Sequence, residues 1–111
     1  AETDLSAVGI NISPLEQVAR LAALTAQAQL DGVVCSAAET TTLRASMPKG
    51  FRLVTPGIRR TEDVAGDQKR IVGPAEAISN GSDYLVVGRP ITASENPLAT
   101  LKEFNRLISR A

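Results

Sequence analysis

The feature that most constrains the fold is an alternation, repeated along the chain, of short apolar runs and segments with helix-start signals. The apolar runs lie near residues 32–36, 51–55 and 83–88, and a helical segment follows each of them. Continuous apolar runs of this length are typical of strands that are covered on both faces of a parallel sheet. The order therefore predicts three adjacent parallel strands joined by right-handed helical crossovers.

Helix boundaries are marked by capping residues. Ser13-Pro14-Leu15-Glu16 combines an N-cap, a proline at the first helical position and a capping-box glutamate, which predicts a helix over about 14–28. Ser36-Ala37-Ala38-Glu39 is a second capping box, whose helix must end at Pro48 and Gly50.

The C-terminal third contains two further helix starts. Gly73-Pro74 predicts a short helix that stops near Asn80-Gly81. Asn96-Pro97 predicts a final helix with four apolar side chains on one face: Leu98, Leu101, Phe104 and Ile108.

The number of strands limits the architecture. Three parallel strands are too few for a doubly wound sheet or a closed barrel, and a β/α barrel needs about 250 residues. The chain has 111 residues, so the sequence predicts a portion of a larger α/β fold. The first residue is Ala1 and not methionine, which agrees with the expectation that upstream residues have been removed.

Composition excludes several classes of function. Twelve basic residues balance twelve acidic ones and the aromatics are one Tyr and two Phe, so we expect neither nucleic-acid binding nor attraction to an acidic membrane. No signal peptide or apolar stretch of about 18 residues is present, which predicts a cytoplasmic protein. With Cys35 as the only cysteine and no histidine, the chain has no internal disulfide, Cys/His metal site or Ser-His-Asp triad. Cys35 is expected to be a small buried apolar residue.

Two motifs carry chemical information, because each follows a predicted strand: Thr55-Pro56-Gly57-Ile58-Arg59 and Val87-Gly88-Arg89-Pro90. Glycine lets backbone N–H groups approach an anion, and arginine offers a forked donor that matches phosphate oxygens. The polar segment 59–70 is predicted to be a long, mobile loop. Each motif alone is equally compatible with an ordinary turn or a solvated surface. Together, at the strand ends, they favour phosphate binding.

The same motifs resemble bacterial orotidine 5'-phosphate decarboxylases. Four blocks in the family's order and spacing carry the resemblance, which covers the whole chain: Asp31–Ser36, Leu53–Arg59, Gly66–Arg70 and Asp83–Ile91. The resemblance implies a TIM-type β/α barrel. Residues 1–111 would be the C-terminal segment of that single domain (about strands 6–8), with strands 1–5 absent.

The resemblance also implies a substrate-binding role for five residues. Arg59 matches the arginine after the seventh strand that contacts substrate, and Gln68 matches the glutamine of the lid loop that reaches the phosphate. Gly88 and Arg89 match the backbone N–H and guanidinium that hold the phosphate after the eighth strand. Pro56 occupies the position at which the family packs an apolar residue near the pyrimidine.

The family converts orotidine 5'-phosphate to UMP and CO2 in pyrimidine biosynthesis without a metal or an organic cofactor, and its members form homodimers. Its catalytic lysine lies in an Asp-x-Lys-x-x-Asp motif near the end of the third strand. Asp67-Gln68-Lys69 begins like this motif, but Val72 stands at the last position and the segment falls in the lid. Lys49 and Lys102 lie at a turn and on the last helix. We therefore expect no catalytic residue in this chain, no activity of the chain alone, and the remainder of the barrel as its partner.

Two alternatives share the same residues. The chain could be a phosphate-binding module without catalysis, or the same segment of a related sugar-phosphate lyase. An Asp-x-Lys-x-x-Asp motif upstream would distinguish the decarboxylase from both.

Overall fold

The computed structural model describes residues 2–63 and 71–109, which form a three-stranded parallel sheet in the order β1-β2-β3. The strands are β1 (Gly32–Val34), β2 (Arg52–Thr55) and β3 (Tyr84–Leu85). Val33 is paired with Leu53, and Val54 with Tyr84. The predicted set of adjacent parallel strands is therefore confirmed, with β2 in the centre.

The helices are α1 (Glu2–Ala7), α2 (Pro14–Gln27), η1 (Ala37–Glu39), α3 (Thr40–Ser46), η2 (Thr61–Asp63), α4 (Pro74–Ser79), α5 (Arg89–Thr92) and α6 (Pro97–Ile108). Four of the helices, α2, η1, α4 and α6, begin at the predicted helix starts. At the start of α2, the Ser13 hydroxyl accepts a hydrogen bond from the Glu16 backbone N–H at 3.2 Å. At the start of α6, the Asn96 side-chain oxygen accepts one from Ala99 at 3.1 Å. No helix in the two described ranges is long and apolar enough to cross a membrane.

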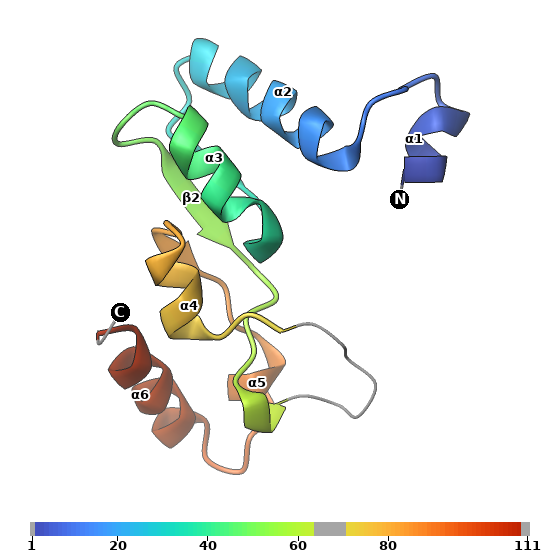
Figure 1. The fold of residues 1–111 in the computed structure, drawn as a ribbon. Helices are drawn as coiled ribbons and strands as arrows, with labels where there is room; N and C mark the ends of the chain where they lie inside the picture. Colours follow the sequence, from blue (N-terminus) through green and yellow to red (C-terminus); the bar gives the residue numbers. More distant parts are fainter. Residues whose placement is uncertain (1, 64–70, 110–111) are drawn as a thin grey trace.

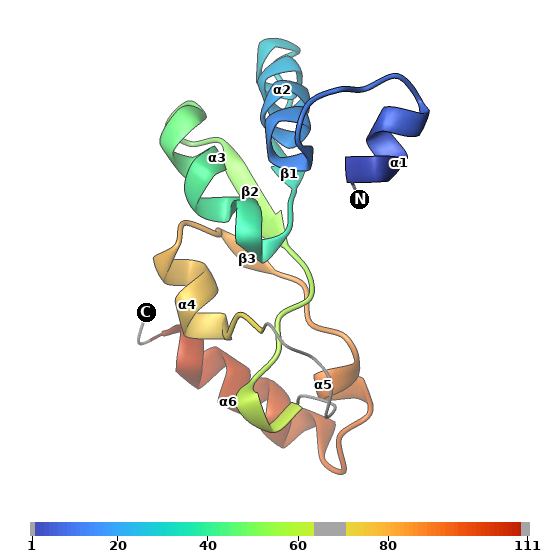
Figure 2. The ribbon, with the colours of Figure 1, turned by 45° about the vertical axis from the view of Figure 1, so that its right-hand side comes forward.

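Several features differ from the sequence-based expectation. The first strand was expected over 32–36, but β1 ends at Val34, and the four-residue helix α5 was not expected. The third apolar run was expected to be strand over 83–88, but β3 ends at Leu85 because the chain turns into α5 at Arg89. The last backbone hydrogen bond of this strand pair runs from the Val86 N–H to the Thr55 carbonyl oxygen, at 2.9 Å. The beginning of the expected loop 59–70 contains the short helix η2, and the rest of that loop, 64–70, lies outside the described residues. The N-terminal helix α1, which lies away from the sheet in Figures 1 and 2, has no capping signal and was not predicted.

The interior consists of two apolar clusters on the helix-covered side of the sheet. One is built around Leu43 and Leu53 between α2, α3 and β2, and it includes the buried Cys35. The other joins Ile58, Ala77 and Phe104 between the segment after β2, α4 and α6. The expected apolar face of α6 is only partly buried: Phe104 is 4% exposed, whereas Leu98 is 61% exposed.

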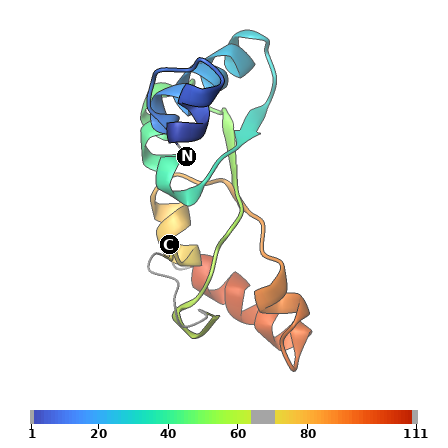
Figure 3. The same cartoon turned by 90° about the vertical axis from the view of Figure 1, so that its right-hand side faces the viewer.

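The opposite face of the sheet is uncovered. Figure 3 shows α3 and α4 on one side of the strands, with no helix against the other side of β1 and β2. Val34, Tyr84 and Val86 on that face are 71%, 57% and 52% exposed. A strand face of this kind is normally buried, so the sheet has the form of part of the wall of a larger barrel.

Candidate anion-binding site

The first site residue, Arg59, is positioned by the turn that follows β2. Gly57 has a φ of +74°, a conformation that glycine adopts without strain, and it redirects the chain after Thr55. Ile58 is then fully buried in the second cluster. The Arg59 backbone N–H donates to the Val72 carbonyl oxygen at 3.3 Å. Arg59 is thus held between a buried anchor and a backbone contact.

The second site residue, Arg89, is the first residue of α5. Gly88 is the N-cap, and its carbonyl oxygen accepts hydrogen bonds from Ile91 and Thr92 at 2.9 and 3.0 Å. Ile91 packs against the cluster that contains Ile58. The one-turn helix therefore fixes the backbone of Arg89.

Arg59 and Arg89 line one cleft (the arginine cleft) of about 380 Å³ at the carboxyl ends of β2 and β3. The other lining residues are Arg60, Asp63, Pro90, Ala93 and Ser94. Neither Arg59 nor Arg89 takes part in the ion pairs found among the described residues. A guanidinium group is a forked donor that matches the oxygens of an anion such as phosphate. With three arginines and one aspartate, the cleft has a positive net charge.

The other predicted site residues are placed differently. Gln68 lies outside the described residues. Pro56 does not line the arginine cleft: it borders a separate hollow of about 580 Å³ together with Ser36, Gly57 and Glu76. Among the residues described, no group of His, Cys, Asp and Glu could hold a metal ion.

Arg60 and Asp63 are part of the cleft that sequence reasoning missed. Two Arg60 nitrogens contact the two Asp63 carboxylate oxygens at 2.7 and 2.8 Å, and the Arg60 guanidinium carbon lies 5.0 Å from the centre of the Phe104 ring. Hydrogen bonds from Arg60 hold the pKa of Asp63 below its usual range, and the same pairing raises the pKa of Arg60. The i,i+3 spacing of opposite charges is the available signal, but the lack of periodicity in this segment predicts a loop.

Comparison with known proteins places this geometry in a family. The model of the orotidine 5'-phosphate decarboxylase / HUMPS family matches residues 2–104. The chain belongs to this family. Two relatives named orotidine 5'-phosphate decarboxylase are those of Aliivibrio fischeri strain MJ11, 58% identical over 94% of this chain, and Photobacterium profundum, 52% identical over 96%. The chain spans only 44% and 46% of the length of these two relatives.

Solved structures of the family agree with the fold. The crystal structure of orotidine 5'-phosphate decarboxylase from Lactobacillus acidophilus matches 96% of this chain and 43% of its own chain, with a TM-score of 0.80 and 30% identity. The enzyme from Pyrococcus horikoshii has a TM-score of 0.68 at 23% identity and supports the fold alone. The three strands are thus a C-terminal portion of a TIM-type β/α barrel, as the family resemblance implied.

Proposed function

We propose that this chain is the C-terminal segment, residues 1–111, of a single-domain orotidine 5'-phosphate decarboxylase, and that it binds the substrate phosphate. The observation that supports this most strongly is the placement of Arg59 and Arg89, from the ends of neighbouring strands, in one cleft. Their guanidinium groups match the geometry of phosphate oxygens. Loops after the last two strands of a β/α barrel commonly bind phosphate.

The remaining site assignments follow from the family. The backbone N–H of Gly88 binds a phosphate oxygen beside Arg89, Gln68 reaches the phosphate from the lid loop, and Pro56 packs near the pyrimidine. The catalytic lysine that protonates the ring carbon after loss of CO2 belongs to the part of the barrel outside this chain. Product UMP, assembly of the complete enzyme as a homodimer and a cytoplasmic location belong to the same proposal.

The phosphate is distant from the carbon that loses CO2, so its binding must act through differential stabilisation. Contacts to the phosphate accelerate the chemical step only where they are stronger in the transition state than in the ground state. Closure of a loop over the phosphate achieves this, because the contacts offset the cost of ordering the loop and excluding water. Each charged hydrogen bond contributes about 1.5–3 kcal/mol.

Steady-state kinetics of the full-length polypeptide that contains this chain test the proposal. Arg89→Ala should lower kcat/KM for orotidine 5'-phosphate by about a hundredfold or more, because a bidentate charged contact is lost. The same substitution should barely change the much slower reaction of orotidine, which has no phosphate. Equal losses with both substrates would show that Arg89 supports folding or base recognition instead.

The control and the competing functions are read from the same assay. Arg20→Met removes an exposed cation on α2 and should leave both reactions unchanged. If the unaltered polypeptide binds phosphate but does not decarboxylate orotidine 5'-phosphate, the chain belongs to a phosphate-binding module or another lyase.

A further inference from the structure

We propose that Arg60 is a positioning residue for the arginine cleft. It acts through its bidentate ion pair with Asp63 (the fork) and through its contact with Phe104. Arg60 follows Arg59 directly in the chain, and both residues line the cleft. The proposal rests on the proposed function, since it assumes that the cleft binds the phosphate of the nucleotide. It adds a residue that does not itself contact the anion.

The pair is well enclosed for two charged groups near a surface. The side chains of Arg60 and Asp63 are 15% and 11% exposed. Besides the two bonds in the fork, the Asp63 carboxylate accepts the Arg60 backbone N–H at 3.0 Å. One carboxylate thus fixes both the side chain and the backbone of Arg60, and closes the turn of η2.

The contact with Phe104 connects this turn to the rest of the molecule. Phe104 is 4% exposed in the second apolar cluster, and the Arg60 guanidinium lies over its ring. Because Arg60 is bonded directly to Arg59, anchoring Arg60 on α6 restricts the backbone of Arg59. Ile58 anchors the other side of Arg59 in the same cluster.

The fork also has an electrostatic consequence. Asp63 lines the cleft, and an unpaired carboxylate there would oppose a phosphate dianion. Arg60 pairs with this carboxylate, whereas Arg59 and Arg89 form no ion pair with the residues that the structure describes. Glu62 contributes little, because its closest approach to Arg60 is 3.8 Å and its side chain is 68% exposed.

Calorimetric titration of the full-length polypeptide with inorganic phosphate, and then with UMP, tests the proposal. Arg60→Met keeps an apolar stem against Phe104 but removes the charge, and should weaken phosphate binding by about tenfold or more, equivalent to the loss of one charged contact. Arg60→Met combined with Asp63→Asn removes the repulsive carboxylate as well. The double variant should recover part of the affinity but remain weaker than the unaltered protein, because the turn is no longer anchored.

Salt and a conservative variant separate this role from a general effect on stability. The difference between Arg60→Met and the double variant should shrink between about 0.05 and 0.5 M salt, since charge repulsion is screened. Arg60→Lys keeps the charge without the fork and should bind phosphate with intermediate affinity. It provides the readout even if Arg60→Met fails to fold. Arg20→Met, which removes a distant exposed cation, should bind like the unaltered protein.

The outcomes distinguish the two proposals. If Arg60→Met or Arg60→Lys binds phosphate and UMP like the unaltered protein, Arg60 has no positioning role. If Arg60→Met and the double variant bind equally, the electrostatic part is wrong. If the unaltered protein binds phosphate but does not decarboxylate orotidine 5'-phosphate, the proposed function fails while the role of Arg60 in the anion cleft stands.

Discussion

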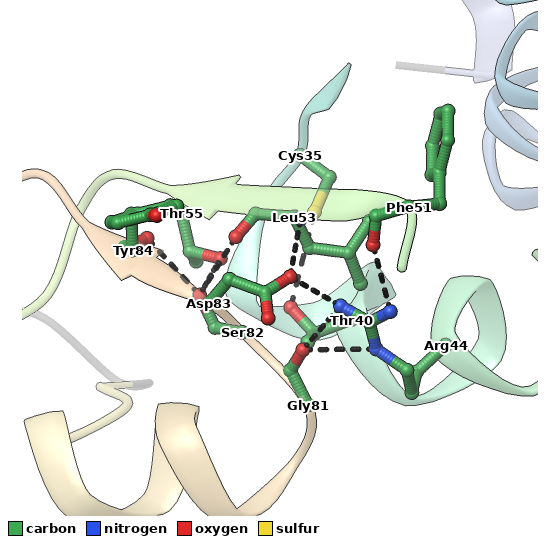
Figure 4. A network of polar contacts seen from close by, with 10 residues as sticks. All are labelled: Cys35, Thr40, Arg44, Phe51, Leu53, Thr55, Gly81, Ser82, Asp83 and Tyr84. Carbon is green, nitrogen blue, oxygen red and sulfur yellow. Dashed lines mark hydrogen bonds and ion pairs between the residues drawn. The ribbon is translucent and has the colours of Figure 1, made fainter. Parts of the chain in front are cut away.

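Arg44 on α3 holds the carbonyl oxygen of Gly81, in the turn before β3, with two of its side-chain nitrogens at 3.1 and 2.9 Å (Figure 4). A third contact of the same guanidinium, at 2.8 Å, is to the Phe51 carbonyl oxygen at the start of β2. Its fourth partner is the Asp83 carboxylate, at 2.5 Å, which also accepts the Leu53 backbone N–H at 2.8 Å. One side chain therefore joins α3 to the amino-terminal ends of two neighbouring strands, the end of a β/α barrel that supports stability.

Replacement of Arg44 should destabilise the full-length polypeptide without changing phosphate binding. Arg44→Met leaves the carbonyl oxygens of Phe51 and Gly81 and the Asp83 carboxylate without this partner. We expect the free energy of unfolding to fall by about 1–3 kcal/mol, reduced from a larger value by the partial exposure of the network. Denaturant unfolding followed by circular dichroism measures the change. Arg20→Met should stay within about 0.5 kcal/mol of the unaltered protein, and a similar result for Arg44→Met would contradict the assigned role.

Gly32 at the start of β1 lies too close to β2 to accept a side chain. An added Cβ would lie 2.1 Å from the Arg52 carbonyl oxygen, far inside contact distance. Gly32→Ala should therefore force the two strands apart and lower the free energy of unfolding by about 2 kcal/mol or more. Gly73→Ala is the matched control, because the nearest atom to its Cβ is 4.0 Å away and its loss should be small. Equal melting temperatures for the two variants would show that β1 and β2 tolerate the added atom.

Cys35 should react slowly in the folded protein. Its side chain is 5% exposed, and burial raises the pKa of the thiol above its ordinary value, so little of the reactive thiolate forms near pH 8. Alkylation followed by peptide mass mapping should therefore find Cys35 unmodified under native conditions and modified after denaturation. Rapid native alkylation would place Cys35 outside the apolar cluster.

The sequence predicted those parts of the fold that depend on local chemistry. The caps at Ser13 and Asn96 fix where α2 and α6 begin, and both were readable because the side-chain partner lies three residues away. The predicted length of β3 was wrong, because Tyr84–Val87 is apolar throughout and apolarity does not mark where a strand stops pairing. That end is set by the turn into α5, a tertiary feature.

The residues of the candidate site were likewise predictable only where the local sequence marks them. Arg59 and Arg89 were found because each follows a strand, and parallel strands bring their carboxyl ends to the same edge. The i,i+3 spacing could have suggested the pair of Arg60 and Asp63, but the contact of Arg60 with Phe104 could not be inferred, because Phe104 lies 44 residues further along the chain. Such a contact exists only once α6 has packed beside η2.

The chain alone should be inactive and prone to association. It contains no site-facing lysine among the described residues, and Val34, Tyr84 and Val86 expose an apolar face that the remaining strands would cover. The purified 111-residue chain should bind a hydrophobic fluorescent dye and sediment as an assembly. Co-expression with the upstream part of the barrel should abolish dye binding. Turnover of orotidine 5'-phosphate by the chain alone would show that a proton donor has been overlooked.

Arg59 and Arg89 should be energetically coupled, because both guanidinium groups face one cleft and would hold the same dianion. In the full-length polypeptide, Arg59→Ala and Arg89→Ala should each lower kcat/KM for orotidine 5'-phosphate. Once one arginine is gone the phosphate is held loosely, so removal of the second should cost less than it does alone. We expect a coupling free energy of about 0.5–3 kcal/mol between the two substitutions, the range for residues that share a partner. A second cycle that pairs Arg89→Ala with Arg20→Met should be additive, because Arg20 is an exposed residue of α2 outside the cleft. Additive losses for Arg59 and Arg89 would mean that the two side chains do not bind a common ligand, and the cleft would then have to be assigned to only one of them.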